Sequence, residues 1–453
     1  MTSRNLGNPD LSNRKFDWGM WAKWFLYVIT FLLWLKGGIS TDGDAITYIN
    51  MDPHRSAGYP LFIKLTSLFG LVHSYRLTAL IALAFGLFVI FRFVDFLKGQ
   101  FKLSSISVFV TSFIFMLPYL VSRLANSILT ETLAYPLFLL AVHMLLKSAF
   151  EKSKRSAIIY LIVVSLLVLV RSQFIFFNII SLLIILYLTW YSQNKIKYAL
   201  PLLGVFLITI LSGNLVDRTY HLALHKHFAV APFIGVQLET MPLYNLKDND
   251  LNLFTDTLKR GLIDTVLSCE KASDIYNIGK NKVKSSEYES FKFMHSYNPI
   301  SWQFAEKYIE HASHKKGLDR KSMDFWIYLD HVTTQIAFRL IKAHPKEYAW
   351  IYLVNFKSGF GDWQLLLPFI MLFLFSIISF FKTGNKISIL FLTVCVLMLS
   401  NITLICIFEP SLDRYTFYTT YLMLAIIFIP VFKSLEKVSE NETQKGQIDI
   451  GGQ

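Results

Sequence analysis

The sequence predicts an all-α polytopic membrane protein with about ten transmembrane helices and a helical cap region that faces outward. Two observations carry this prediction. The 453 residues have a mean hydropathy of +0.45, with 54% hydrophobic and only 17% charged residues, values that a soluble chain of this size rarely reaches. Basic residues also gather at every second junction between apolar segments, as the positive-inside rule requires.

Apolar segments of near-spanning length supply the predicted helices. Those at 157–170 and 199–211 are short for a full span. The remaining segments approach the ~20 residues that cross a hydrocarbon core. In chain order the predicted segments are 18–35, 74–96, 106–121, 133–146, 157–170, 174–191, 199–211, 365–381, 387–408 and 417–432.

The domain organisation follows from these segments. The first one lacks a small-residue cleavage site, so we expect it to be retained as a helix. The charges of the short junctions place both termini in the cytoplasm. The predicted parts are a cytoplasmic leader at 1–17, helices one to seven at 18–211 with a first outer loop at 38–73, an outward-facing helical region at 212–364, helices eight to ten at 365–433, and a disordered cytoplasmic tail at 434–453.

Composition and motifs exclude several classes of protein. A net charge of +13 on a membrane protein favours contact with anionic lipid headgroups, and no basic-aromatic pattern indicates nucleic acid. The three cysteines, Cys269, Cys395 and Cys406, form no CxxC pair, so neither a disulfide framework nor a thiolate metal site is predicted. The histidines lack metal-ligand spacing, and there is no Walker loop, GxGxxG or nucleophile elbow.

The first outer loop carries the densest group of candidate residues. Asp42 and Asp44 flank a glycine, and Tyr48 follows Asp44 by four residues, on the same face if a short helix begins there. Arg55 then precedes a Gly-Tyr-Pro return to the membrane. The aspartates can simply cap a solvated turn. A carboxylate followed by a cation beside a bilayer also suits a proton-abstracting base next to a phosphate-bearing lipid.

Two further outward junctions contribute charged residues. Glu131 opens an apolar helix, where it either complements the helix dipole or serves as a second active-site acid or sugar-hydroxyl acceptor. Arg171 lies between two apolar runs, as an interfacial anchor or as a lipid-phosphate ligand. The sequence leaves both pairs of alternatives open.

A late junction supplies the last candidates. Glu409, Asp413, Arg414 and Tyr415 are close together after the ninth segment. Asp413 and Arg414 can pair with other loop charges, and Tyr415 can be an interface aromatic. The alternative is that Arg414 and Tyr415 bind substrate.

Taken together, these residues resemble the GT-C superfamily of membrane glycosyltransferases, in particular the protein mannosyltransferase and aminoarabinose transferase type. The resemblance rests on Asp44 with Tyr48, on Arg55 and the return to the membrane, on Glu131 at a helix start, and on the Arg414-Tyr415 pair. The chain departs from that pattern in two ways. It has Asp-Gly-Asp where relatives often have Asp-Glu or a lone Asp, and it lacks a Lys-Pro-Pro element.

The resemblance implies an inverting transfer of a sugar from a polyprenyl-phosphate-linked donor to a lipid, glycan or protein acceptor, on the outer face of a bacterial inner membrane. Asp44 or Asp42 would be the catalytic base, and Tyr48, Arg55, Glu131, Arg171, Arg414 and Tyr415 would bind substrate. No cofactor is expected; a divalent cation held by the two aspartates is conceivable but not favoured.

Two other functions compete with this prediction. A glycan ligase or polymerase that uses lipid-linked sugars would favour arginine and histidine in the long outer region over an acidic first loop. A lipid or polysaccharide transporter would place polar residues at mid-membrane in broken helices. The membrane segments carry few charges away from their ends, which favours an enzyme.

Overall fold

The computed structural model describes residues 18–41, 43–68, 74–272, 288–361 and 363–450. Within these ranges the chain is helical, and the isolated parallel bridge between Ser40 and Ser127 is the β-pairing found there. This confirms the predicted all-α class. It is also what a bilayer demands, because a helix satisfies its own backbone hydrogen bonds without water.

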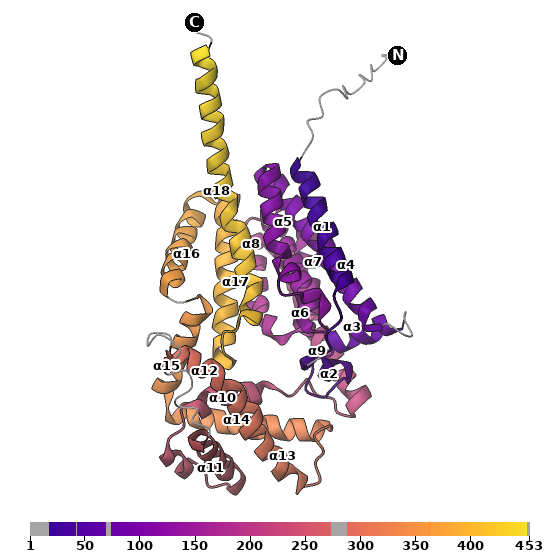
Figure 1. The fold of residues 1–453 in the computed structure, drawn as a ribbon, viewed down its shortest axis with the longest axis vertical. Coiled ribbons are helices and arrows are strands. Elements are labelled where there is room, and N and C mark those ends of the chain that lie inside the picture. The colour runs from indigo at the N-terminus through magenta and orange to yellow at the C-terminus, as the bar shows by residue number, and fades with distance from the viewer. Residues whose placement is uncertain (1–17, 42, 69–73, 273–287, 362, 451–453) are drawn as a thin grey trace.

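A bundle of long helices forms one end of the molecule (Figure 1). Its packing centres on α6, which contacts α4 and α7, and on α18, which contacts α5 and α17. Aromatic rings fill the space between these elements: Phe174 and Tyr418 meet edge to face at 5.0 Å between ring centroids, and Phe138 lies 5.7 Å from Tyr418. The bundle helices are α1 (Trp18–Lys36), α4 (Ser74–Phe101), α5 (Ser105–Leu120), α6 (Thr130–Glu151), α7 (Lys154–Val170), α8 (Phe177–Trp190), α9 (Lys195–His225), α16 (Trp363–Thr383), α17 (Lys386–Phe408) and α18 (Asp413–Ile450).

Eight stretches of the described chain are long and apolar enough to cross a membrane. The protein is therefore a multi-pass integral membrane protein. The two other predicted segments correspond to α1 and to α7, which has 17 residues; both are helices packed into the same bundle. The predicted short seventh segment is wrong, since α9 has 31 residues and continues to His225.

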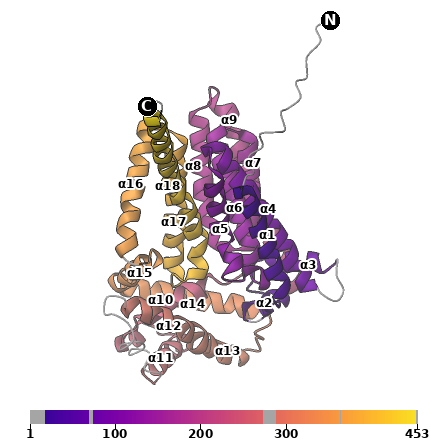
Figure 2. The same ribbon diagram turned by 45° about the horizontal axis from the view of Figure 1, so that its top comes forward.

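Short helices of the middle region form a cap at one end of the bundle (Figures 1 and 2). The cap has a hydrophobic core of its own, in which Phe293, Ile300, Phe325 and Leu329 are almost fully buried. Its elements are α10 (Ile234–Tyr244), η4 (Asp248–Leu253), α11 (Thr257–Ala272), α12 (Tyr288–Asn298), the π-helix η6 (Pro299–Glu306), α13 (Lys307–His314), α14 (Met323–Ala343) and α15 (Pro345–Gly359). The start of α1 and the end of α18 lie at the opposite end (Figure 1).

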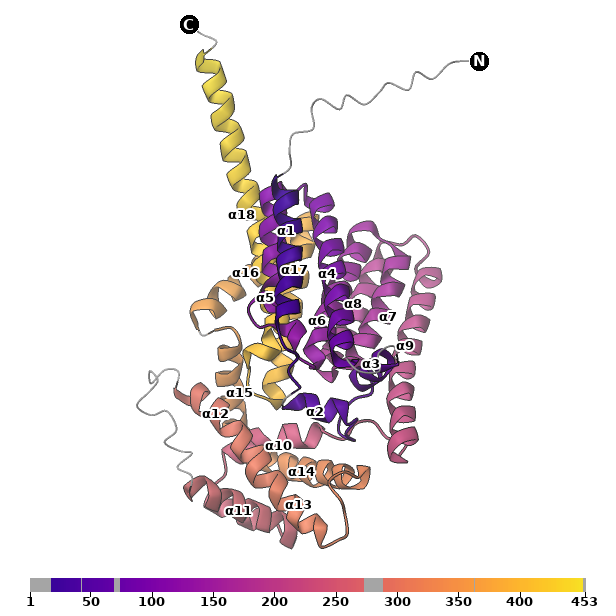
Figure 3. The same cartoon turned by 45° about the vertical axis from the view of Figure 1, so that its right-hand side comes forward.

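The predicted first outer loop folds into two short helices at the cap end of the bundle; the first lies between the bundle and the cap, and the second lies beside the bundle (Figure 3). These are α2 (Asp44–Ile49) and α3 (Gly58–Ser67). The loop starts from a fixed point, because the Trp34 indole donates to the Ala125 carbonyl at 3.1 Å and Asn126 donates back to the Trp34 carbonyl at 3.1 Å. The end of α1 is thereby tied to η2 (Leu124–Asn126), directly before the helix that carries Glu131.

Residues 434–450 belong to the tail that the sequence predicts to be disordered, and this disorder stays a prediction. The structure continues α18 as a helix to Ile450. This stretch is polar, but it is rich in Glu, Lys and Gln, which have high helix propensity.

Candidate functional site

Asp44 is the first residue of α2, and its carboxylate lies between two arginines from opposite ends of the chain. Its Oδ1 accepts from Arg55 Nη2 at 2.9 Å, and its Oδ2 accepts from Arg414 Nη2 at 3.0 Å. Gly43 precedes the helix with φ of 60°, a conformation that an L side chain rarely adopts. The glycine of Asp-Gly-Asp thus permits the turn that starts α2 at the acidic residue.

Electrostatics keep Asp44 ionised. Burial by itself would raise the pKa of this carboxyl, but the Arg55 and Arg414 guanidinium groups outweigh it and lower the pKa below the ordinary 3.8. An ionised carboxylate can accept a proton. Its two charge-assisted hydrogen bonds nevertheless weaken it as a base while they persist.

Arg55 is held in place by the helix that carries Asp44. Its Nε donates to the Thr47 hydroxyl at 2.8 Å, and its Nη1 donates to the Tyr48 hydroxyl at 3.1 Å. The guanidinium also lies over the Tyr48 ring, 4.5 Å from its centroid. The four-residue spacing of Asp44 and Tyr48 therefore works as predicted, since one turn of α2 presents both to Arg55.

Glu131 is the buried centre of the site. Its side chain is 4% exposed, and its Oε1 pairs with Arg171 Nη1 at 2.8 Å and with Arg414 Nη2 at 3.0 Å. Its Oε2 accepts from the Thr130 hydroxyl at 3.1 Å. A buried carboxylate is stable only when it is paired and hydrogen-bonded, and here both oxygens are engaged.

Arg414 joins the two carboxylates into one network. Its Nη2 lies 3.0 Å from Asp44 Oδ2 and 3.0 Å from Glu131 Oε1. Arg171 extends the network by donating to Thr130 Oγ1 at 3.0 Å and to Gln173 Oε1 at 2.8 Å. Three guanidinium groups (Arg55, Arg171, Arg414) face two carboxylates, which leaves one net positive charge.

Tyr415 is fixed between the two distal arginines. Its ring lies 5.1 Å from the Arg171 guanidinium carbon and 5.3 Å from that of Arg414. Its carbonyl accepts from Gln173 Nε2 at 2.9 Å and from Asn401 Nδ2 at 3.1 Å. Sequence reasoning missed Gln173 and Asn401, because a lone amide in or beside an apolar segment is a weak signal.

The end of α9 clamps the loop that carries Arg55. Asp217 accepts from the Ala57 amide at 2.7 Å and from the Ala231 amide at 3.1 Å, through its two separate oxygens. His221 Nε2 lies 3.0 Å from the Pro53 carbonyl. One carboxylate thus binds backbone amides of both the first outer loop and the segment that leads into the cap. No pattern in the sequence indicates this role.

Gly58 allows the loop to approach Arg171. A Cβ built at this position would lie 2.6 Å from the backbone carbonyl of Leu169, near the end of α7. Since backbone atoms cannot move aside like a flexible side chain, only glycine lets α3 pack this closely. The contact places the Arg55 loop against the chain segment from which Arg171 projects.

Glu409 links the site to the cap. Its side chain accepts from Gln237 of α10, and its backbone carbonyl accepts from Asn355 of α15 at 2.7 Å. It also shares side-chain hydrogen bonds with Tyr415 of the site and Tyr297 of α12. The cap is therefore bonded directly to the junction that carries Arg414.

The structure brings seven of the eight candidate residues together: Asp44, Tyr48, Arg55, Glu131, Arg171, Arg414 and Tyr415. The eighth, Asp42, lies outside the described residues. In the part of the chain that the structure describes, no three His, Cys, Asp or Glu side chains form a group that would hold a metal ion. Whether a cation joins Asp42 and Asp44 thus stays a prediction.

Comparison with known proteins adds no relative: no family model, no curated protein and no solved structure matches the chain. The function must therefore be argued from the residues themselves.

Proposed function

We propose that this protein is a membrane glycosyltransferase that moves a sugar from a polyprenyl-phosphate-linked donor to the hydroxyl of a lipid, glycan or protein acceptor. The observation that carries the proposal is Asp44, an ionised carboxylate at the start of α2, held by two arginines at 2.9 and 3.0 Å. The resemblance to GT-C enzymes adds to it. The proposed setting is the outer face of a bacterial inner membrane.

Asp44 is the catalytic base in this proposal. The acceptor hydroxyl gives its proton to an Asp44 oxygen as its own oxygen attacks the anomeric carbon. The bond from that carbon to the phosphate oxygen breaks, and its electron pair leaves with the lipid phosphate. Displacement at one centre in a single step inverts the anomeric configuration.

The arginines are the sites for the phosphate. Arg414 is 43% exposed, while Arg55 and Arg171 are 15% and 12% exposed, so Arg414 is the most accessible of the three. A phosphate that binds Arg414 and Arg55 competes with Asp44 for their donors. Donor binding therefore weakens the ion pairs of Asp44 and raises its basicity at the moment when the acceptor must lose its proton.

Glu131 has a positioning role in this scheme. Its carboxylate is buried and both of its oxygens accept hydrogen bonds. We therefore assign Glu131 to holding the guanidinium groups of Arg171 and Arg414 in position, and not to contacting a sugar. Hydrophobic side chains for the lipid tail lie nearby on α2 and α3, where Ile46 is 52%, Leu61 40% and Leu65 58% exposed. A polyprenyl chain needs such apolar surface beside its headgroup.

The decisive test compares the wild type with Asp44→Asn in lipid nanodiscs. Each is given polyprenyl-phosphate sugars and candidate acceptors, and glycosylated product is measured by mass spectrometry. We expect the transfer rate of Asp44→Asn to be lower than that of the wild type by about 100-fold or more, the usual contribution of a general base. Asp413→Asn, an exposed neighbour of the site, is the matched control and should retain activity. Full turnover by Asp44→Asn would refute the assignment, and transport without transfer by the wild type would favour a transporter.

A further inference from the structure

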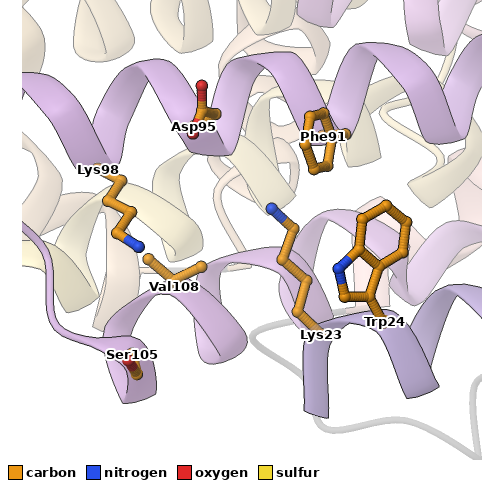
Figure 4. Close-up of a pocket in the computed structure, with 7 residues that line it drawn as sticks. All are labelled: Lys23, Trp24, Phe91, Asp95, Lys98, Ser105 and Val108. Carbon is orange, nitrogen blue, oxygen red and sulfur yellow. The ribbon is translucent and has the colours of Figure 1, made fainter. Parts of the chain in front are cut away.

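A second group of charged residues lies at the other end of the bundle, far from the candidate site. There α1, α4 and the start of α5 enclose a cavity of about 150 Å³ (Figure 4). Lys23 and Trp24 of α1 line it, as do Asp95 and Lys98 of α4 and Ser105 at the start of α5. No step of the proposed transfer uses these residues.

Lys23 is the unusual member of this group. The residue is 7% exposed, and its ammonium points into the space between the helices (Figure 4). It lies 4.1 Å from the centroid of the Phe91 ring, and among the described residues it has no hydrogen bond or salt bridge. An ammonium has three donors, and the countercharge of Lys23 is Asp95, which lines the same cavity. The Lys23 donors therefore remain open to an acceptor that enters the cavity from outside the protein.

The surroundings define the charge of that acceptor. Lys23 and Lys98 face Asp95, which leaves one net positive charge on the cavity lining. The N-terminus of α5 adds partial positive charge at Ser105. A group with one negative charge and several acceptor oxygens fits best, and a phosphodiester has both properties.

The cavity borders a surface that faces lipid. Trp24 is 49% exposed, and Phe25 and Phe88 on the neighbouring faces of α1 and α4 are 67% and 60% exposed. Trp and Lys together near a helix end are typical of headgroup depth in a bilayer. Acyl chains would continue along these exposed side chains.

We infer that this cavity binds the phosphodiester of an anionic phospholipid headgroup, with Lys23 and Lys98 as its cationic ligands and Asp95 as the group that limits its affinity. The site lies at the opposite end of the bundle from Asp44 and does not depend on the proposed function. Since Lys23 is on α1 and Lys98 on α4, the bound headgroup would join two helices whose ammonium groups otherwise repel each other.

The test measures lipid retention by native mass spectrometry of the purified full chain. Phosphatidylglycerol is the anionic probe, phosphatidylcholine the zwitterionic one, and inorganic phosphate in excess the competitor. The proposal expects wild type to prefer phosphatidylglycerol. Lys23→Met should weaken its binding by about fivefold, the effect of one basic residue near an anionic lipid surface. Lys102→Met, an exposed lysine just after α4 that does not line the cavity, is the control and should bind as the wild type does.

A second variant separates binding from folding. Asp95→Asn removes the negative charge and should strengthen phosphatidylglycerol binding, in the opposite direction from Lys23→Met. A general loss of packing would weaken binding in both variants, and that outcome would overturn the proposal, as would unchanged binding by Lys23→Met. Displacement of the lipid by inorganic phosphate would assign the cavity to free phosphate and would also overturn it.

Discussion

Asp44 and Arg414 are 370 residues apart in the sequence, yet Arg414 Nη2 donates to Asp44 Oδ2 across 3.0 Å. The same Nη2 lies 3.0 Å from Glu131 Oε1. A single guanidinium thus connects the first outer loop, the start of α6 and the start of α18.

Arg414→Lys should fail to preserve the site, although it keeps the charge. A lysine ammonium is a compact point charge and cannot present the planar fork with which Arg414 spans two carboxylates. We expect activity to fall by about tenfold or more, the scale of a misplaced transition-state charge. Activity is measured as glycosylated product at saturating and at limiting donor.

The control for this change is Arg123→Lys, the same substitution at an exposed arginine just before η2. It should leave activity within about twofold of wild type, as most surface substitutions do. If Arg414→Lys were equally silent, the bridging role of Arg414 would be wrong.

The pH dependence of kcat/KM should report the lowered pKa of Asp44. Because Arg55 and Arg414 hold this pKa below 3.8, the carboxylate stays ionised as pH falls through the ordinary range of aspartate. Arg55→Gln removes one of these charges but leaves the burial. We therefore expect the acid limb of kcat/KM to move to higher pH in Arg55→Gln.

The lowered pKa of Asp44 also affects the stability of the folded protein. A lowered pKa stabilises the folded state above the pKa of the unfolded chain, and this contribution is lost as pH falls through the folded pKa. An acid limb that stayed in place in Arg55→Gln would show that the group titrating in kcat/KM is not Asp44.

Gly58→Ala should disturb the packing between α3 and α7. The new Cβ would lie 2.6 Å from the Leu169 carbonyl carbon and oxygen, so the backbone must shift. Overpacking of this kind typically costs about 1–3 kcal/mol. We expect a lower melting temperature together with reduced activity, since the Arg55 loop moves away from Arg171.

Gly38→Ala serves as the matched control. A Cβ at Gly38 meets nothing within 4 Å, although this glycine lies in the same first outer loop. Its melting temperature and activity should remain close to wild type. Equal losses from both substitutions would show that the contact with Leu169 does not cause the loss at Gly58.

Stability of the cap should decrease as pH rises. Glu239 of α10 is fully buried, and neither of its carboxylate oxygens has a hydrogen-bond partner in the described structure. Burial, with the nearby Glu306 and Asp330, raises the pKa of Glu239 well above 4.5. Burial also raises the pKa of Glu306 to about 7, although Arg320 opposes this shift.

The direction follows from proton linkage. A raised pKa means that the folded cap binds more protons than the unfolded chain, so the free energy of unfolding falls as pH rises above 4.5. The slope from one such group is about 1.4 kcal/mol per pH unit. This slope is measured by hydrogen exchange of α10 peptides, corrected for intrinsic exchange rates. The range is about pH 5 to 8, which lies above the ordinary pKa of a glutamate side chain.

Glu239→Gln should make this dependence shallower, whatever it does to the absolute stability, because the amide does not titrate. Glu347→Gln, at a carboxylate on the cap surface, should keep the wild-type slope. A slope that survives unchanged in Glu239→Gln would mean that another group controls the pH dependence.

The sequence by itself determined the helical class, the multi-pass membrane location and the residues worth examining. Apolar runs of sufficient length must be helices in a bilayer, because no water satisfies their backbone groups. It also determined the local geometry of Asp44 and Tyr48, since a four-residue spacing is one turn of helix.

Only the tertiary structure decided which charges meet. The sequence is compatible with Glu131 as a helix-start carboxylate and Arg171 as an interfacial anchor, each without a partner. Their 2.8 Å contact in the structure is what makes them an ion pair. The clamp by Asp217 was invisible, because its partners are backbone amides of Ala57 and Ala231, which no side-chain pattern reveals. Hydropathy fixes that a segment is a helix, but which faces of two helices touch depends on the packing of side chains that are distant in sequence.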